Sequence, residues 1–398
     1  MIKIMREVSE EEQIYNLNRV SQTTRGSLIQ IHIADIHFGE IDPKVQYQIL
    51  EEQFLNKIRD IHFDLISIDG DLFKHKYMSN SEAVMYATMF INRIVEECRL
   101  KQATFILLHG TSYHDASQLK LFYHYLQDPT IDIRIVEEVR FEYVKGAKIL
   151  CIPELYNKGA KYYENFLYHS GEYDAVFMHG TYEKSIFGMD KPNLDSTREP
   201  VFCMEHFCRC KGFIISGHVH TGGCFNSYFY YTGTPIRYAH GEENEKGFLV
   251  VLHNLDSGQH YVHLEPIKSF IYRSINLDHM LMSDPKDIIE YVSNLQSQGV
   301  DHVRIEFKPT ENEKAIANIE LIKKYYRSNN TIKIKSQNIK TKNTIKANEE
   351  MLDKYKDYDY ILDKSLSEHE ILTRYINHNM GYQYISVEEL KKILEEEF

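Results

Sequence analysis

The sequence predicts an α+β protein made of one large unit, a small βαβαβ unit and a helical C-terminal tail. Between residues 28 and 267, short apolar runs alternate with amphipathic segments, a pattern typical of strands separated by helices. Strand and helix patterns alternate again, on a smaller scale, between residues 268 and 345. A chain of 398 residues can bury one large core and a second, smaller one. We therefore expect four segments, at residues 1–27, 28–267, 268–345 and 346–398.

The composition is that of an ordinary globular protein, with 43% hydrophobic and 26% charged residues. No run of about 18 apolar residues occurs, so no membrane span is expected, and residues 1–27 lack the apolar segment of a signal peptide. The six cysteines include no CxxC pair, and free thiols in a reducing cytoplasm are the simpler interpretation. A zinc site remains an alternative at Cys203, Cys208, Cys210 and Cys224.

Within the small unit, the order of elements is indicated by helix boundaries and apolar alternation. Strands are expected at 270–277, 302–307 and 331–339, and a helix at 312–328. A further helix begins at Asp284 as N-cap and Pro285 in the first turn, and it ends before Gly299.

Five predicted strands of the large unit each end in aspartate or histidine. They lie at 28–34, 63–68, 103–108, 174–178 and 213–215, and they run into Asp35-Ile36-His37, Asp69-Gly70-Asp71, His109-Gly110, His179-Gly180 and Ser216-Gly217-His218-Val219-His220. Carboxyl ends of strands lie along one edge of a sheet, so we expect these side chains to converge. In an extended D-x-H or H-x-H, both side chains lie on the same side. The adjacent glycines allow the backbone to approach an ion or a phosphate closely.

One such motif alone is usually structural, but five in order predict a metal site. Carboxylate and imidazole ligands together suit manganese, iron or zinc better than magnesium or calcium alone. Asp69 is the alternative to Asp71, and we prefer Asp71 because it directly follows Gly70. We interpret the other nearby histidines, namely His32, His62, His75 and His109, as core or surface residues.

The ordered motifs DIH, GD, HD, HG and GHVH resemble those of the calcineurin-like metallophosphoesterases. More narrowly, they resemble the SbcD nucleases, whose eukaryotic relative is the meiotic-recombination-eleven protein. The segments Tyr231-Thr232-Gly233-Thr234-Pro235 and Glu242-Glu243-Asn244-Glu245-Lys246-Gly247-Phe248 are similar to that family's closing segment. The resemblance covers about residues 28–340. It implies a four-layer α/β/β/α metallophosphoesterase sandwich, followed by a small capping domain that binds DNA.

The resemblance also implies hydrolysis of phosphodiester bonds by a two-metal mechanism. One divalent ion would be held by Asp35, His37, Asp71 and His220, and the second by Asp71, His179 and His218. Mn²⁺ is the ion expected first, with Fe²⁺ or Zn²⁺ as alternatives. His114 would stabilise or protonate the leaving oxygen. The implied activity is that of a DNA exonuclease or endonuclease subunit in an SbcCD-like complex that processes double-strand breaks.

The sequence departs from the family pattern at two places. The family usually has GNHD or GNHE, in which the asparagine binds a metal, whereas this chain has Gly110-Thr111-Ser112-Tyr113-His114-Asp115. The second metal could then use Thr111, a backbone carbonyl or water. The extension before the first strand is the other departure, and Ser9 and Glu12 predict a capped helix at 9–20 within it.

A local excess of positive charge marks a candidate DNA-binding surface. The formal net charge is −12, yet residues 321–348 contain eight basic residues and no acid. From this stretch we expect Lys333, Lys335, Lys340 and Lys342 to contact DNA, with an ordinary solvated surface as the alternative.

The function of the whole protein has three rival interpretations. They are a phosphatase or cyclic-nucleotide phosphodiesterase, a non-catalytic member of the fold, and a zinc-ribbon DNA-binding protein.

The tail at 346–398 is acidic and helix-like. A capping box at Ser386 and Glu389 precedes the apolar residues Leu390, Ile393 and Leu394. Such short amphipathic helices usually dock on a larger surface. The resemblance implies that this surface is the coiled-coil base of an SbcC-type ATPase, within a heterotetramer containing a homodimer of this chain. The alternative is that the helices fold back on the capping unit. The expected location is the cytoplasm of a bacterial cell or of a phage-infected host.

Overall fold

The computed structural model describes residues 26–336 except 184–191, 243, 309 and 311. It confirms the expected mixture of multi-stranded sheets and helices. The chain forms two compact units. The first contains the described residues up to Ile275, with Lys286–Ile305 and Tyr326–Lys333, and the second contains Asn276–Pro285, Glu306–Tyr325 and the described residues from Ile334.

The first six-stranded sheet has the strand order β14-β13-β1-β2-β3-β4. Its strands are β1 (Ser27–Ile33), β2 (Leu65–Asp69), β3 (Thr104–Leu108), β4 (Asp132–Val136), β13 (Gly247–Asn254) and β14 (His260–Pro266). The four strands from β1 to β4 are parallel, so that their carboxyl ends meet at one edge. β13 and β14 extend the sheet with antiparallel pairing.

The second six-stranded sheet has the order β11-β12-β10-β7-β6-β5. Its strands are β5 (Arg140–Val144), β6 (Ala147–Ile152), β7 (Tyr173–His179), β10 (Cys210–Gly217), β11 (Gly223–Cys224) and β12 (Phe229–Tyr231). The central strands β6, β7, β10 and β12 are parallel. Two short strands, β8 (Thr181–Tyr182) and β9 (Val201–Phe202), pair separately.

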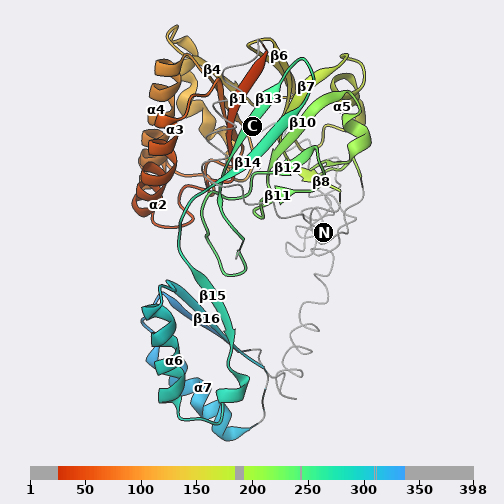
Figure 1. Ribbon diagram of the computed structural model, residues 1–398. Coiled ribbons are helices and arrows are strands. Elements are labelled where there is room, and N and C mark those ends of the chain that lie inside the picture. The colour runs from red at the N-terminus through yellow and green to blue at the C-terminus, as the bar shows by residue number, and fades with distance from the viewer. Residues whose placement is uncertain (1–25, 184–191, 243, 309, 311, 337–398) are drawn as a thin grey trace, which may run out of the picture. The chain divides into compact units, whose positions relative to one another are not determined.

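The two sheets stack face to face between outer layers of helices (Figure 1). Side chains such as Leu65 and Ile106 from the first sheet and Phe177 and Ile215 from the second share one buried cluster between the sheets. Successive residues of a strand alternate between faces. Accordingly Leu28 belongs to the cluster between the sheets, whereas Ile29, Ile31 and Ile33 belong to the cluster that the first sheet shares with its helices. Both faces of the first sheet are therefore buried at β1.

The outer helices are α2 (Pro43–Leu50), α3 (Asn56–Asp60) and α4 (Glu82–Lys101) on the first sheet and α5 (Ala160–Leu167) on the second. A π-helical turn at Glu51–Leu55 joins α2 to α3. Asp42 caps α2 by accepting hydrogen bonds from the backbone of Lys44 and Val45, and Ser81 caps α4 through Val84. Among the described residues, 3₁₀ helices occur at Ala116–Gln127, Met204–Phe207 and Asp278–Met280.

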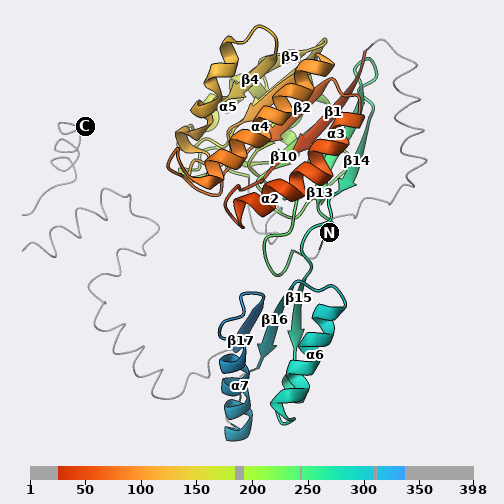
Figure 2. The ribbon, with the colours of Figure 1, turned by 90° about the vertical axis from the view of Figure 1, so that its left-hand side faces the viewer.

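The C-terminal part of the described chain has the expected βαβαβ order (Figure 2). Its elements are β15 (Tyr272–Asn276), α6 (Pro285–Ser297), β16 (His302–Phe307), α7 (Glu313–Tyr325) and β17 (Ile332–Ser336), and the strands form a sheet in the order β15-β16-β17. Alternate residues of β16, namely Val303, Ile305 and Phe307, are buried, so this strand has one covered face. The helices expected at 9–20 and in the tail lie outside the described residues.

None of the helices in the described part of the chain combines the length and the apolar character needed to cross a bilayer.

Candidate metal centre

The predicted site residues follow the carboxyl ends of strands from both six-stranded sheets. Asp35 and His37 follow β1, Asp71 follows β2, His179 ends β7, and His218 follows β10. The convergence that we expected at the edge of a sheet occurs where the edges of two sheets meet. β1 and β2 belong to the first sheet, whereas β7 and β10 belong to the second. The ligands converge because the two sheets are stacked with these ends adjacent.

The structure brings all six predicted metal ligands into groups that could hold a metal ion. Within each group, potential ligand atoms lie within 4.8 Å of one another. The groups are Asp35–His37–His220, His37–Asp71–His114, Asp35–Asp71–His179 and Glu154–His179–His218. Asp71 and His37 each occur in two groups, as do Asp35 and His179, so the groups form one continuous cluster.

One end of this cluster is formed by His37 and its neighbours. The Nε2 atom of His37 lies 3.0 Å from Nε2 of His220 and 3.8 Å from Oδ2 of Asp71. Oδ1 of Asp35 lies 4.0 Å from the same nitrogen. Burial lowers the pKa of His37 to about 3, which leaves its imidazole neutral and able to donate a lone pair.

His179 and His218 form the other end. Nε2 of His179 lies 3.3 Å from Oδ2 of Asp71 and 3.8 Å from Oε2 of Glu154. Nδ1 of His218 lies 3.1 Å from Oε2 of Glu154. Burial alone would raise the pKa of Asp71, but the neighbouring His179, His37 and His114 outweigh it and hold this pKa below its usual value. Asp71 is therefore an anionic carboxylate between two sets of histidines.

The backbone of the ligand loops is left-handed at several positions. The φ angles are 50° at Asp35, 49° at His37, 56° at Asp71 and 84° at His218. The backbone at Asp35, His37 and His218 is therefore not extended as we expected, because these residues lie beyond the strands. Asp35 and His37 nevertheless belong to one group of potential ligands. Backbone hydrogen bonds from Asp35 to Gly70 (3.1 Å) and from His37 to Asp71 (3.0 Å) hold the loops together. Left-handed backbone at non-glycine residues is strained, and it concentrates at functional sites.

The close approach of the loops requires glycine at Gly70, Gly110 and Gly217. A Cβ atom on Gly110 would lie 2.2 Å from Oδ1 of Asp71, and one on Gly217 would lie 2.3 Å from the carbonyl oxygen of Asp69. At Gly180 the protein itself leaves more room, since a Cβ there would meet its nearest neighbour at 3.4 Å.

The altered loop after β3 places Thr111 and His114 against Asp71. The backbone N–H of Thr111 donates to Oδ1 of Asp71 (2.6 Å), and its hydroxyl lies 3.3 Å from both Asp71 and Glu154. The ring of His114 contacts the ring of His37, and its Nε2 lies 3.8 Å from Asp71. Nδ1 of His114 is hydrogen-bonded to the carbonyl oxygen of Lys74. That acceptor requires the proton on Nδ1 and directs Nε2 towards the cluster.

The sequence interpretation missed several acidic residues of the site, among them Glu199, which lies 3.4 Å from Nε2 of His218. Glu154 follows β6 and is fully buried among the histidines, with no recognisable motif around it. Asp115 accepts hydrogen bonds from the backbone of Asp71, Leu72, Phe73 and Gly110, so it organises two ligand loops. Glu242 lies 3.4 Å from Nδ1 of His220 and orients that ring. The sequence pointed to two of these acids only indirectly. Asp115 lies beside His114, and Glu242 lies in the closing segment.

Among the described residues, Asp69, Lys333 and Lys335 lie outside the groups of potential metal ligands. Asp69 is buried and pairs with Nδ1 of His32 at 2.9 Å instead of joining the cluster. Lys333 and Lys335 are exposed on β17, whereas Lys340 and Lys342 lie outside the described residues. Within residues 26–336 as described, no group of potential metal ligands contains a cysteine.

Comparisons with known proteins add little to this geometry. No protein-family model matches the chain, and no curated protein matches it. One solved crystal structure aligns with 61% of this chain and 100% of its own, at 12% sequence identity and a TM-score of 0.37. A likeness at this level carries no argument about fold or function.

Proposed function

We propose that this protein is a metal-dependent phosphodiesterase that cleaves DNA, with the fold and mechanism of the SbcD-like metallophosphoesterases. The observation that carries the proposal is the position of Asp71. Its carboxylate belongs both to a group with His37 and His114 and to a group with Asp35 and His179. A carboxylate shared by two ligand groups is the arrangement needed to hold two cations side by side.

The donor set fits a pair of divalent transition-metal ions. Buried carboxylates alternate with imidazoles, a combination that suits Mn²⁺, Fe²⁺ or Zn²⁺. Asp35, His37, Asp71 and His220 would hold one ion, and Asp71, His179 and His218 would hold the second. Bound ions of this kind supply Lewis-acid stabilisation of phosphate oxygens and an activated water.

The protein's own groups then orient and protonate the substrate. The hydrogen bond to Lys74 leaves Nε2 of His114 as the atom that can exchange a proton with a leaving oxygen. Glu242 and Asp115 fix His220 and the loops around Asp71, so that the ligands hold their geometry when substrate binds.

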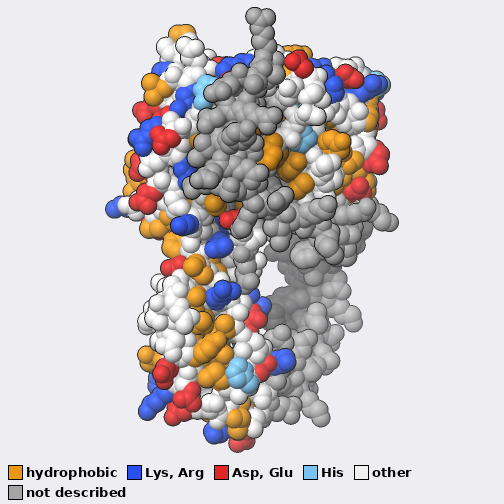
Figure 3. Space-filling model, in the orientation of Figure 1, with side chains coloured by type: hydrophobic (Ala, Val, Ile, Leu, Met, Phe, Trp, Pro, Cys, Tyr) orange, Lys and Arg blue, Asp and Glu red, His pale blue; other side chains and the backbone are white. Residues whose placement is uncertain are grey.

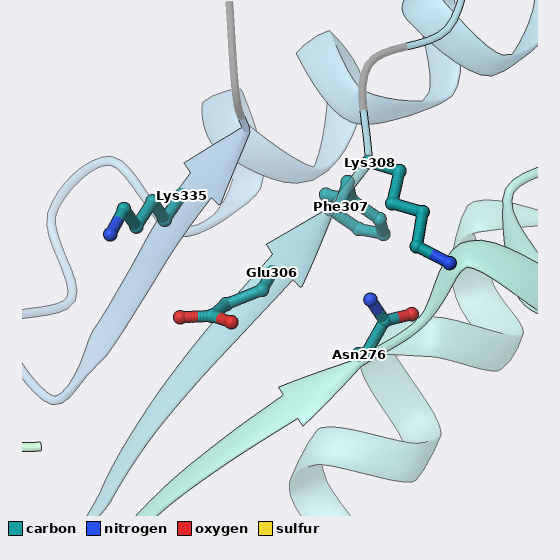
Figure 4. Close-up of a pocket in the computed structure, with 5 residues that line it drawn as sticks. All are labelled: Asn276, Glu306, Phe307, Lys308 and Lys335. Atoms are coloured by element: carbon teal, nitrogen blue, oxygen red, sulfur yellow. The ribbon is translucent and has the colours of Figure 1, made fainter. Parts of the chain in front are cut away.

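DNA is the proposed substrate because of the basic residues near the C-terminal end of the described chain. Lys333 and Lys335 are exposed and two residues apart on β17, so they project from the same face of the strand. Lys335 also lines a shallow pocket with Lys308, Asn276, Phe307 and Glu306 (Figure 4). Elsewhere, on the face drawn in Figure 3, basic and acidic side chains are mixed over the surface of the first unit.

The proposed function is tested with two substrates. Purified protein with Mn²⁺ is expected to cleave a linear DNA duplex, and chelation by EDTA should abolish that cleavage. Bis(p-nitrophenyl) phosphate serves as the small phosphodiester. Hydrolysis of the small substrate without cleavage of DNA would identify a phosphodiesterase of another substrate class, and inactivity on both would indicate a non-catalytic member of the fold.

Removing the basic residues should weaken DNA binding at every sequence. Replacing Lys333, Lys335, Lys340 and Lys342 by Gln is expected to lower affinity and to flatten its dependence on salt, by about one unit of slope per lost phosphate contact. The double variant Lys333→Gln/Lys335→Gln should show part of this effect. Lys158→Gln/Lys161→Gln removes two exposed lysines at the start of α5 and is the matched control. An unchanged salt slope in the quadruple variant would make the stretch an ordinary solvated surface.

The proposed partners are DNA and an SbcC-type coiled-coil ATPase, joined in a heterotetramer that contains two copies of this chain. This proposal rests on residues 349–398, which carry thirteen acids, six basic residues and apolar positions at helical spacing. They lie outside the described residues. The proposed location is the cytoplasm of a bacterial cell or of a phage-infected host.

Deletion of residues 349–398 tests whether the tail docks on the ATPase or folds back on the capping unit. The truncated protein should remain soluble, keep its metal-dependent nuclease activity and lose the ATPase in co-purification, because short amphipathic helices are stable mainly when docked. Full-length protein purified with the same ATPase is the control. Retained binding of the ATPase would show that the tail is not the docking element.

A further inference from the structure

The group of potential ligands formed by Glu154, His179 and His218 contains an acidic residue that the family pattern does not supply. Where the family pattern has a metal-binding asparagine, this chain has Thr111. The second metal ion would therefore lack one of the ligands that the family provides. We propose that Glu154 replaces the missing amide as a direct ligand of the second metal ion. This inference rests on the two-metal site proposed above.

Glu154 reaches the position through the pairing of β6 with β7. These strands are parallel, with Ile152 beside Met178, so the residues just past their ends are neighbours. His179 is the last residue of β7, and Glu154 lies two residues beyond β6. A sixth strand of the two sheets therefore delivers a potential ligand to the same edge.

The contacts of Glu154 point one carboxylate oxygen at the metal ligands. Oε2 lies 3.1 Å from Nδ1 of His218, 3.8 Å from Nε2 of His179 and 3.3 Å from the hydroxyl of Thr111. The hydroxyl of Tyr156 donates to the other oxygen, Oε1. Tyr156 is thus a positioning residue, because it fixes the rotation of the carboxylate and leaves Oε2 directed at the histidines.

The groups that compensate the charge of Glu154 are two histidines and the hydroxyls of Thr111 and Tyr156. The side chain is fully buried, and its ion pairs among the described residues are with His179 and His218. A buried carboxylate is costly unless it is paired or coordinates a metal. The nearby Asp71 adds a second anionic group 3.3 Å from the same His179 nitrogen. A divalent cation among these atoms would balance both carboxylates at once.

The alternative role for Glu154 is to orient His218 without touching the metal. Glu242 plays that role for His220, where its carboxylate lies beside Nδ1. Glu154 differs because it forms a group of potential ligands with two histidines, His179 and His218. The ligand atoms of this group all lie within 4.8 Å of one another. It therefore occupies a ligand position rather than a position behind one ring.

Metal stoichiometry is the first test. Wild-type protein loaded with Mn²⁺ and dialysed is expected to retain two ions per chain, measured by elemental analysis, and Glu154→Ala should retain one. The loss corresponds to at least about 100-fold weaker binding at the second site, since even indirect partners of metal ligands contribute 10–100-fold. Glu142→Ala removes a buried carboxylate of β5 that pairs with Arg134 and Arg140, and this control should retain two ions. Two ions held with unchanged affinity in Glu154→Ala would overturn the inference.

A thiol at the same position distinguishes a ligand from an orienting residue. Glu154→Cys loaded with Co²⁺ is expected to show a cobalt–thiolate charge-transfer absorption, because thiolate is a strong ligand for such ions. Wild-type protein, which carries six native cysteines, is the control and should lack this band. Absence of the band from a folded, Co²⁺-loaded Glu154→Cys would contradict direct ligation. Circular dichroism and thermal unfolding of Glu154→Gln, which keeps the shape of the side chain, separate loss of metal from loss of fold.

The outcomes separate this inference from the proposed function. Wild-type protein that binds two Mn²⁺ ions but cleaves neither DNA nor a small phosphodiester would contradict the function while the Glu154 assignment stands. Wild-type protein that binds no metal would overturn both. Active wild-type protein with an unchanged metal count in Glu154→Ala would overturn only the inference.

Discussion

Replacement of Asp71 by Asn is expected to abolish metal-dependent cleavage of DNA while leaving the protein folded. Asp71 is the carboxylate common to the groups around His37 and His179, so a neutral amide there weakens the hold on both ions. Lewis-acid stabilisation is worth several kcal/mol. Since each 1.36 kcal/mol changes the rate tenfold, the loss should be at least about 10³-fold. His218→Ala should have a similar effect by removing a ligand from the second group.

The measurement is the rate of duplex cleavage with Mn²⁺, together with the metal content of each variant. Asp69→Asn is the matched control, because Asp69 lies two residues away and pairs with His32 in the core instead of the cluster. That variant should lose stability but keep its metal ions. Cleavage by Asp71→Asn or His218→Ala at the wild-type rate would contradict the two-metal interpretation.

The strands that carry the site were predictable because their sequences are short, apolar and followed by polar residues. The run ending at Asp35, for example, is buried as β1, and the strand predicted at 302–307 is observed over that range as β16. Burial of apolar side chains is a local property of such runs, so the sequence alone reveals it. The existence and order of the ligand-bearing strands followed from it.

The geometry of the ligands was not predictable in the same way. The left-handed backbone at Asp35 is held by a hydrogen bond to Gly70, which lies on another strand's loop. Such a conformation depends on partners distant in the sequence, and local residue preferences oppose it for a non-glycine residue. The assignment of the strands to two sheets is likewise a long-range property, because a single sheet and a stacked pair have the same apolar runs.

Glu154 shows most clearly what could not be predicted from the sequence alone. It follows an apolar strand as the predicted ligands do, but a single glutamate after Cys151-Ile152-Pro153 forms no metal-binding motif. Only the parallel pairing of β6 with β7 places it beside His179. The missing asparagine signalled that a ligand was absent, but not which residue compensates.

His114→Ala is expected to lower turnover on DNA by about 10²–10⁴-fold, the usual contribution of a general acid or base. Both metal ions should be retained. The hydrogen bond from Nδ1 to the carbonyl of Lys74 leaves Nε2 as the only ring atom able to protonate a leaving alkoxide. The variant should therefore be far less impaired on bis(p-nitrophenyl) phosphate, whose leaving group is stable without a proton.

This dependence on the leaving group distinguishes an acid from a ligand. Nε2 of His114 lies 3.8 Å from Asp71, and the residue shares a ligand group with His37 and Asp71. If His114 bound a metal ion, its removal would lower the metal content and would impair both substrates equally. Rates on the two substrates, measured with metal content on the same preparation, decide between the roles, and Asp69→Asn again serves as the control. Loss of a proton donor should impair mainly the cleavage of DNA, whereas loss of a metal ion should impair both substrates equally. An equal loss of rate on both substrates, with one ion missing, would therefore assign His114 to the metal instead of the leaving oxygen.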